Sequence, residues 1–153
     1  MLAKEYCDAI KRKKKPVIVS HHMLSGLKQG QAKMSKSDAD SAIFMEDTIE
    51  DVNRKIKKSY CPEKIAAENP ILDYCKNIIF PAQGKMVINV NGKGPQTWLT
   101  YDSLLADYTE GNVHPGELKP AVAEAINKLL QPVRDHFVND PYAKELLATI
   151  KGW

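Results

Sequence analysis

The chain has 153 residues, of which 43% are hydrophobic and 27% are charged, and its formal net charge is +3. This length suits one large domain or two small ones with a packed core, and the small net charge excludes a protein that coats nucleic acid over its whole surface. No apolar run approaches the roughly 20 residues of a membrane span, and the charged N-terminus predicts no signal peptide. Three widely spaced cysteines, Cys7, Cys61 and Cys75, predict free thiols in a reducing compartment, which favours the cytoplasm.

The N-terminal stretch predicts a helix and then a strand. Apolar side chains share one face of a helix over residues 1–14, Pro16 ends the pattern, and the β-branched run at residues 17–19 predicts a short buried strand. A helix, a strand and a glycine-containing loop are typical of the last αβ unit of a Rossmann-type nucleotide-binding sheet. Because one strand cannot form a sheet, we interpret residues 1–43 as the end of a larger domain and the chain as a fragment. We therefore expect little hydrogen-exchange protection over residues 1–36.

Two clusters of cations lie at residues 11–15 and 54–58. Either cluster can contact phosphates. Either can equally be helix C-terminal charge that complements the helix dipole.

Residues 33–37 form a Lys-Met-Ser-Lys-Ser run after a glycine-containing stretch. Lys33 and Lys36 each carry a compact charge with three donors on a flexible stem, and Ser35 and Ser37 add hydroxyl donors without bulk. The run predicts a mobile loop that closes over a polyphosphate. A solvated linker is the alternative.

From residue 44 onward the periodicity predicts amphipathic helices. Thr48, with Asp51, forms the capping signature of the first helix. Asn69 is an N-cap for the second helix, which we expect to stop at Pro81.

The remaining pattern predicts a hairpin and three more helices. Residues 86–90 and 97–101 are β-rich and are joined by Asn-Gly-Lys-Gly. Asp102 is expected to cap a short helix, a long helix bent at Pro132 is expected over residues 118–138, and Asp140 precedes the last helix. The long helix carries an apolar stripe of Val122, Ile126, Leu129, Val133 and Phe137. The fold class is therefore mainly α, with a helical domain and a small β-hairpin over residues 44–153.

The run at residues 33–37 resembles the second signature of class I aminoacyl-tRNA synthetases. The resemblance implies that Lys33 and Lys36 stabilise the triphosphate of ATP while the amino acid attacks the α-phosphorus. It also implies that Met34, Ser35 and Ser37 help to bind ATP.

His22, Met23 and Leu24 follow the predicted strand at its C-terminal end. Nucleotides bind outside the C-terminal ends of strands in such sheets, so we expect these residues near the adenine edge of ATP. Ordinary loop packing is the alternative.

The second half resembles tyrosyl-tRNA synthetases of the archaeal and eukaryotic type. The resemblance is carried by residues 56–62, by Asn-Pro-Ile at residues 69–71, and above all by His-Pro-Gly-Glu-Leu-Lys at residues 114–119. It implies part of a tyrosine–tRNA ligase that uses ATP, with Mg²⁺ carried by the nucleotide and no metal bound by the protein, and that binds tRNA-Tyr. The tyrosine pocket and a dimer interface are expected in the missing N-terminal part.

No His-x-Gly-His element, which class I enzymes use to hold ATP, is present in the chain. We therefore expect the fragment alone to be inactive. The alternatives are a tryptophanyl-tRNA synthetase fragment, a free-standing tRNA-binding module, or a protein-interaction fragment.

His114 and Glu117 are the candidate anticodon residues. In the similar synthetases this segment binds the first anticodon base, a guanine, through a histidine and an acidic residue. Glutamate stands here where aspartate is usual, and the second stacking aromatic of the family has no counterpart in residues 91–94. Trp98 is nearby but is expected in the hairpin core. A helix N-terminal cap is the alternative for His114 and Glu117.

Overall fold

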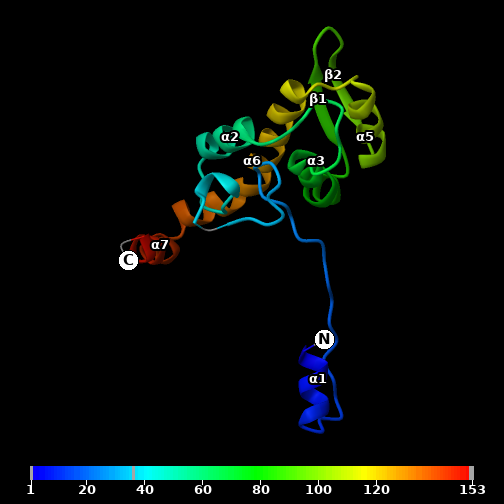
Figure 1. Ribbon diagram of the computed structural model, residues 1–153. Helices are drawn as coiled ribbons and strands as arrows, with labels where there is room; N and C mark the ends of the chain where they lie inside the picture. The colour runs from blue at the N-terminus through cyan, green and yellow to red at the C-terminus, as the bar shows by residue number, and fades with distance from the viewer. Residues whose placement is uncertain (1, 36, 152–153) are drawn as a thin grey trace.

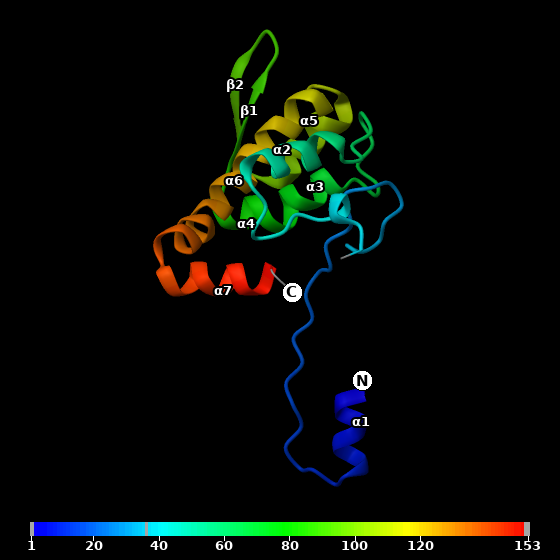
Figure 2. The same cartoon turned by 90° about the vertical axis from the view of Figure 1, so that its left-hand side faces the viewer.

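The computed structural model describes residues 2–35 and 37–151, and its elements form a helical body with one outlying helix (Figure 1). The body contains the following elements in chain order: a 3₁₀ turn η1 (Ala39–Ser41), α2 (Ile49–Lys58), α3 (Pro70–Tyr74), a π segment η2 (Cys75–Ile79), α4 (Phe80–Gln83), β1 (Met86–Val90), β2 (Gly94–Trp98), α5 (Tyr101–Glu110), α6 (Pro115–Asn139) and α7 (Pro141–Lys151). The outlying helix, α1 (Leu2–Ala9), stands apart at the end of an extended segment in both views (Figure 2).

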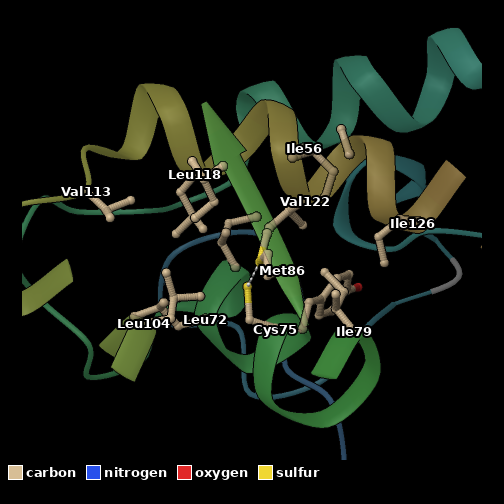
Figure 3. Close-up of a cluster of buried hydrophobic side chains, with 14 of the residues drawn as sticks. Ile56, Leu72, Cys75, Ile79, Met86, Leu104, Val113, Leu118, Val122 and Ile126 are labelled. Carbon is tan, nitrogen blue, oxygen red and sulfur yellow. Dashed lines mark hydrogen bonds between the residues drawn. The ribbon is translucent and has the colours of Figure 1, made fainter. Parts of the chain in front are cut away.

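The long helix α6 is the centre of the body. It contacts α2, β1, η2, α3 and α7, and its buried side chains Leu118, Val122 and Ile126 face one continuous core (Figure 3). The predicted apolar stripe is confirmed as far as Ile126. Leu129, Val133 and Phe137 are only half-buried, because α6 extends beyond the elements that pack on its first half.

The second predicted helix is longer than expected. Asn69 caps it as predicted, its side chain accepting from the amides of Ile71 and Leu72 at 3.1 and 3.3 Å. Pro81 does not stop it, since α3, η2 and α4 run on to Gly84, which is in the left-handed conformation. A proline ring lacks an amide donor and clashes with the carbonyl four residues earlier, and the wider π turn just before Pro81 accommodates both defects.

The hairpin forms in a different register from the predicted one. β1 pairs antiparallel with β2, with Met86 opposite Trp98 and Val90 opposite Gly94. The second strand is therefore residues 94–98 and not 97–101. Trp98 is buried in the hairpin core, as expected. Tyr101 begins α5, whose N-cap is Thr100 and not Asp102, because the Thr100 hydroxyl accepts from the amide of Ser103 at 3.2 Å.

Helix α6 begins three residues earlier than predicted. His114 is its N-cap, so Pro120 lies inside the helix, whereas the predicted start at residue 118 would have put it in the first turn. Because Pro120 has no amide donor, α6 loses one backbone hydrogen bond. The capping contacts at His114 and the burial of one face of α6 offset this loss. Thr48 caps α2 as predicted, accepting from the amide of Asp51. Asp140 precedes α7 as predicted, and its carboxylate accepts from the amide of Ala143.

The predicted strand at residues 17–19 is absent. These residues are extended but unpaired, and Val17 and Val19 are 92% and 85% exposed. A β-branched run forms a strand only where a neighbouring strand accepts its hydrogen bonds, and the described residues offer none here. The first helix is likewise shorter than expected, ending at Ala9 and not at residue 14. Within the described ranges, no helix combines the length and the apolar character that crossing a membrane requires.

Candidate functional site

The lysine-containing loop is anchored at its start by Leu27, which is fully buried. The Leu27 amide donates to the Ser41 carbonyl at 2.9 Å, and the Tyr60 amide donates to the Leu27 carbonyl at 2.8 Å. The Gly26 amide donates to the Gln31 carbonyl, and the Gln31 side chain fills the space that a Cβ at Gly26 would occupy. This end of the loop is therefore held on the helical body.

The other end of the loop is anchored by Ser41, which is also fully buried. Its hydroxyl accepts from the Ser35 amide at 3.1 Å and donates to the Asp38 carbonyl at 2.7 Å. The hydroxyls of Ser35 and Ser37 lie 2.8 Å apart, and Lys28 pairs with Asp38 across the loop at 2.5 Å. Ser35 therefore bonds both to Ser37 and to Ser41 at the base of the loop.

A hollow of about 620 Å³ lies beside this loop. It is lined by His21, His22, Met23, Leu24, Lys33, Met34 and Asn77. The structure thus brings together the predicted adenine residues and the first lysine of the run. Lys33 is exposed, and within the described part of the chain its ammonium has no hydrogen-bond or ion-pair partner. Lys36 lies outside the described residues.

A carboxylate on α3, which sequence reasoning missed, contacts the segment that enters this hollow. Asp73 Oδ2 accepts from the amide and the hydroxyl of Ser25, both at 3.2 Å. Asp73 Oδ1 lies 2.8 Å from His22 Nε2 and accepts from Asn77 Nδ2 at 2.7 Å. The available signal was the spacing of Asp73 and Asn77, because residues four apart share one face of a helix.

His114 and Glu117 form a capping box at the start of α6, away from the hollow. His114 Nδ1 accepts from the Gly116 amide at 3.0 Å, and Glu117 Oε2 accepts from the His114 amide at 2.9 Å. Glu117 Oε1 accepts from the Asn91 amide in the hairpin turn at 2.8 Å. These backbone donors, His114 first and Asn91 second, lower the pKa of Glu117. The cap interpretation is thereby confirmed, and the His114 ring, with 60% of its side chain exposed, remains accessible.

The cations at residues 54–58 are largely committed to structural contacts. Lys55 is buried and pairs with Asp47 at 2.6 Å. Arg54 pairs with Asp40 at 2.5 Å, a hydrogen bond that lowers the pKa of Asp40, and Lys58 approaches the same carboxylate at 3.5 Å. This cluster is therefore not a uniform phosphate-binding surface. Over residues 2–35 and 37–151, no group of three or more histidine, cysteine or acidic side chains is arranged to hold a metal ion.

The chain matches the family described as tRNA synthetases class I (W and Y) over residues 1–131. It therefore belongs to this family, as the run at residues 33–37 predicted. Among its relatives, tyrosine–tRNA ligase 1, cytoplasmic, of Arabidopsis thaliana is 54% identical over 155 residues, which cover 100% of this chain and 40% of that protein. Within the family the chain thus lies with the tyrosyl-tRNA synthetases and not with the tryptophanyl enzymes.

Solved structures agree with this placement. Leishmania major tyrosyl-tRNA synthetase in complex with tyrosinol has a TM-score of 0.84 and 46% identity, over 99% of this chain and 24% of that one. Tyrosyl-tRNA synthetase from Aeropyrum pernix has a TM-score of 0.84 and 37% identity, over 99% of this chain and 44% of that one. The chain spans less than half the length of these relatives.

Proposed function

We propose that this chain is the part of a tyrosine–tRNA ligase that carries the ATP-stabilising loop and the anticodon-binding domain. The observation that carries the proposal is the hollow in which Lys33 meets residues 22–24, in a chain similar to tyrosyl-tRNA synthetases over its whole length. The parent protein activates tyrosine with ATP and transfers it to tRNA-Tyr. The chain alone lacks a His-x-Gly-His element and is inactive.

The domain boundary of this proposal lies between residues 43 and 44. Residues 1–43 complete a Rossmann-type catalytic domain, and residues 44–153 form the anticodon-binding domain. Support comes from the exposed apolar side chains of the first part, including Leu2, Val17 and Val19, which are 83%, 92% and 85% exposed. Such side chains find a partner when the rest of a sheet covers them. The remainder of the parent supplies the tyrosine pocket and a dimer interface, and we place the parent in the cytoplasm, since the Arabidopsis relative is named cytoplasmic.

At the hollow, the residues of this chain suit the binding of ATP and its Mg²⁺. Lys33 and Lys36 stabilise the charge that develops on the triphosphate, while Met34, Ser35 and Ser37 shape the loop. His22, Met23 and Leu24 lie against the adenine. Bound Mg²⁺ is carried by the phosphates, which give it oxygen ligands.

The test is to substitute the lysines in the parent enzyme. A preorganised donor for developing charge is worth roughly 10²–10³ in rate. Lys33→Ala and Lys36→Ala are each expected to slow tyrosine-dependent pyrophosphate exchange by that factor, with tyrosine affinity nearly unchanged. Lys85→Ala is the matched control, because this exposed lysine lies in the turn before β1, far along the chain from the loop. An unchanged rate, or an equal loss of tyrosine binding, would contradict the role.

For the anticodon, we propose that the His114 ring stacks on the first base and that the Glu117 carboxylate accepts from the guanine edge. The exposed ring supports the first role. The lowered pKa of Glu117, which keeps the carboxylate ionised, supports the second role. Each Glu117 oxygen accepts one backbone hydrogen bond and keeps a second lone pair for a base.

Because Glu117 also caps α6, the test must separate the two roles. Glutamine serves as well as glutamate at this position of a capping box, so the single oxygen of Glu117→Gln can still accept from the His114 amide, while the bond from Asn91 and the charged acceptor are lost. Its discrimination between tRNA with guanine at the first anticodon position and tRNA changed there is expected to fall roughly tenfold, within the 1–3 kcal/mol of a good base-edge contact. Equal discrimination by the two enzymes would leave Glu117 as a cap alone.

A further inference from the structure

We infer that Asp73 is a positioning residue for the nucleotide hollow. Its carboxylate, on the helical body, holds the segment at residues 22–25 in place and thereby sets one wall of the hollow that Lys33 lines. The inference rests on the proposed function where it concerns ATP. We call the contacts of Asp73 with His22, Ser25 and Asn77 the clamp, and their geometry does not depend on the proposed function.

Both oxygens of the Asp73 carboxylate contact polar groups, from the segment at residues 22–25 and from Asn77. Oδ2 accepts two hydrogen bonds from Ser25. Oδ1 accepts one from Asn77 and lies 2.8 Å from His22 Nε2. Only 19% of the Asp73 side chain is exposed, so these contacts are partly shielded from water and correspondingly stronger. Ser25 and Asp73 are 48 positions apart in the sequence, and the clamp therefore joins two distant segments.

Asn77 connects the clamp directly to the hollow. Its Nδ2 donates both to Asp73 Oδ1 and to the Asp73 carbonyl, at 2.7 and 3.2 Å, and Asn77 itself lines the hollow. Both hydrogen bonds fix the amide plane. The same network thus orients a residue on each side of the hollow: His22 from the entering segment and Asn77 from η2.

The clamp is also the first attachment of the chain to the helical body. Within the described residues before Ser25, hydrogen bonds and ion pairs are local, such as Lys15 with Asp8, apart from the contact of His22 with Asp73. α1 and the extended segment after it project away from the body (Figure 2). Leu24, directly before Ser25, and Met34 are partly buried and also pack against the core. Without Asp73, the first attachment would be the apolar contact of Leu24 with the core, and the segment would lose the polar contacts of His22 and Ser25 that hold it beside Lys33.

An isosteric amide cannot replace this carboxylate. With its oxygen towards Ser25, an amide would set its NH₂ group against the Asn77 donor, and in the other orientation it would set it against the Ser25 amide. Asp73→Asn therefore breaks half of the clamp while preserving side-chain volume, and Ser25→Ala removes one contact from the other side without altering the helical body. Asp107→Asn is the matched control, because the Asp107 carboxylate on α5 likewise accepts two side-chain donors, Trp98 Nε1 at 2.7 Å and Asn112 Nδ2 at 3.1 Å.

The first experiment measures hydrogen exchange on the 153-residue chain. Asp73→Asn is expected to speed exchange of the Ser25 amide, which donates to Asp73, roughly tenfold or more in peptides covering residues 22–27, as loss of a hydrogen bond to a charged group implies. Ser25→Ala should give a smaller increase. Protection of residues 122–130 in α6 should not change, and Asp107→Asn should leave residues 22–27 at the wild-type rate. Wild-type exchange at residues 22–27 in Asp73→Asn, or an equal loss of protection throughout α6, would overturn the inference.

The second experiment measures pyrophosphate exchange by the parent enzyme. Asp73→Asn is expected to raise the KM for ATP or lower kcat roughly tenfold while the KM for tyrosine stays constant, and Asp107→Asn should change neither. Wild-type values for both ATP parameters in Asp73→Asn would overturn the inference. A wild-type parent that catalyses no exchange would instead refute the proposed function, and the hydrogen-exchange result would then decide the clamp by itself.

Discussion

Lys55 and Asp47 form an ion pair in which both side chains are buried, with exposed fractions of 3% and 9%. Lys55 Nζ also donates to the Ala42 carbonyl at 3.0 Å and lies over the ring of Phe44. The pair fixes the connection between the lysine loop and α2. Removing one partner of such a pair leaves the other charge buried and uncompensated, which costs about 3–5 kcal/mol.

We therefore expect Asp47→Ala to lower the free energy of unfolding of this chain by about 3 kcal/mol or more, measured by urea denaturation. The control is Asp40→Ala, because Asp40 pairs with Arg54 and Lys58 at the surface. Exposed pairs contribute little to stability, so this variant should unfold close to the wild-type midpoint. Similar losses in the two variants would show that burial adds nothing to the Lys55 pair.

At the level of elements, the N-terminus of α6 joins a helix to a hairpin through one carboxylate. Glu117 accepts from the amides of His114 and Asn91, and the pKa of Glu117 is lowered from its ordinary value of 4.5. A group whose pKa is lowered in the folded state contributes stability above its unfolded pKa, and that stability is lost as pH falls through the folded pKa. Glu117 should therefore stabilise the fold at neutral pH and cease to do so in acid.

We expect Glu117→Ala to be less stable than wild type by about 1 kcal/mol at pH 7, a typical value for a helix cap. The difference should stay constant down to about pH 5 and shrink as the pH falls below 4.5. Urea denaturation of both proteins at a series of pH values measures it. A difference that is independent of pH down to pH 3 would contradict the ionised cap.

For the whole molecule, the structure narrows the expected region of weak protection. Residues 2–21 make only local hydrogen bonds within the described chain, whereas Leu27 bonds to Ser41 and Tyr60 and is fully buried. We therefore narrow the prediction of weak protection from residues 1–36 to residues 2–21, because residues 22–27 contact the helical body. Within residues 122–130 of α6, Val122, Ala123, Ile126 and Leu130 belong to the core, and Figure 3 shows Val122 and Ile126 there.

Hydrogen exchange on the chain should accordingly show little protection for residues 2–21, intermediate protection for residues 25–27 and the highest protection for residues 122–130. Amides exchange through local opening in poorly packed segments and only through global unfolding in the core. Addition of the missing part of the parent should raise the protection of residues 2–21. Strong protection of residues 2–21 in the isolated chain would mean that this segment docks on the body or on another copy of the chain.

The sequence by itself determined the helix caps and the family of the chain. The caps at Thr48 and Asn69 involve partners within three residues, so their signatures were sufficient to predict them. The run at residues 33–37 and the segment at residues 114–119 were sufficient to predict the family, and the matches with tyrosyl-tRNA synthetases confirm it.

Only the tertiary structure determined which residues far apart in the sequence contact each other. The strand at residues 17–19 does not form, since strand formation depends on a neighbour that the described chain does not supply, and Pro81 remains inside a helix because a π turn accommodates it. Lys55 belongs to a run of cations that looks solvated in the sequence, yet it is buried against Asp47. Asp73 meets Ser25 across 48 positions. Periodicity and capping patterns report interactions between residues a few positions apart, whereas the partner of a buried charge depends on how distant segments pack.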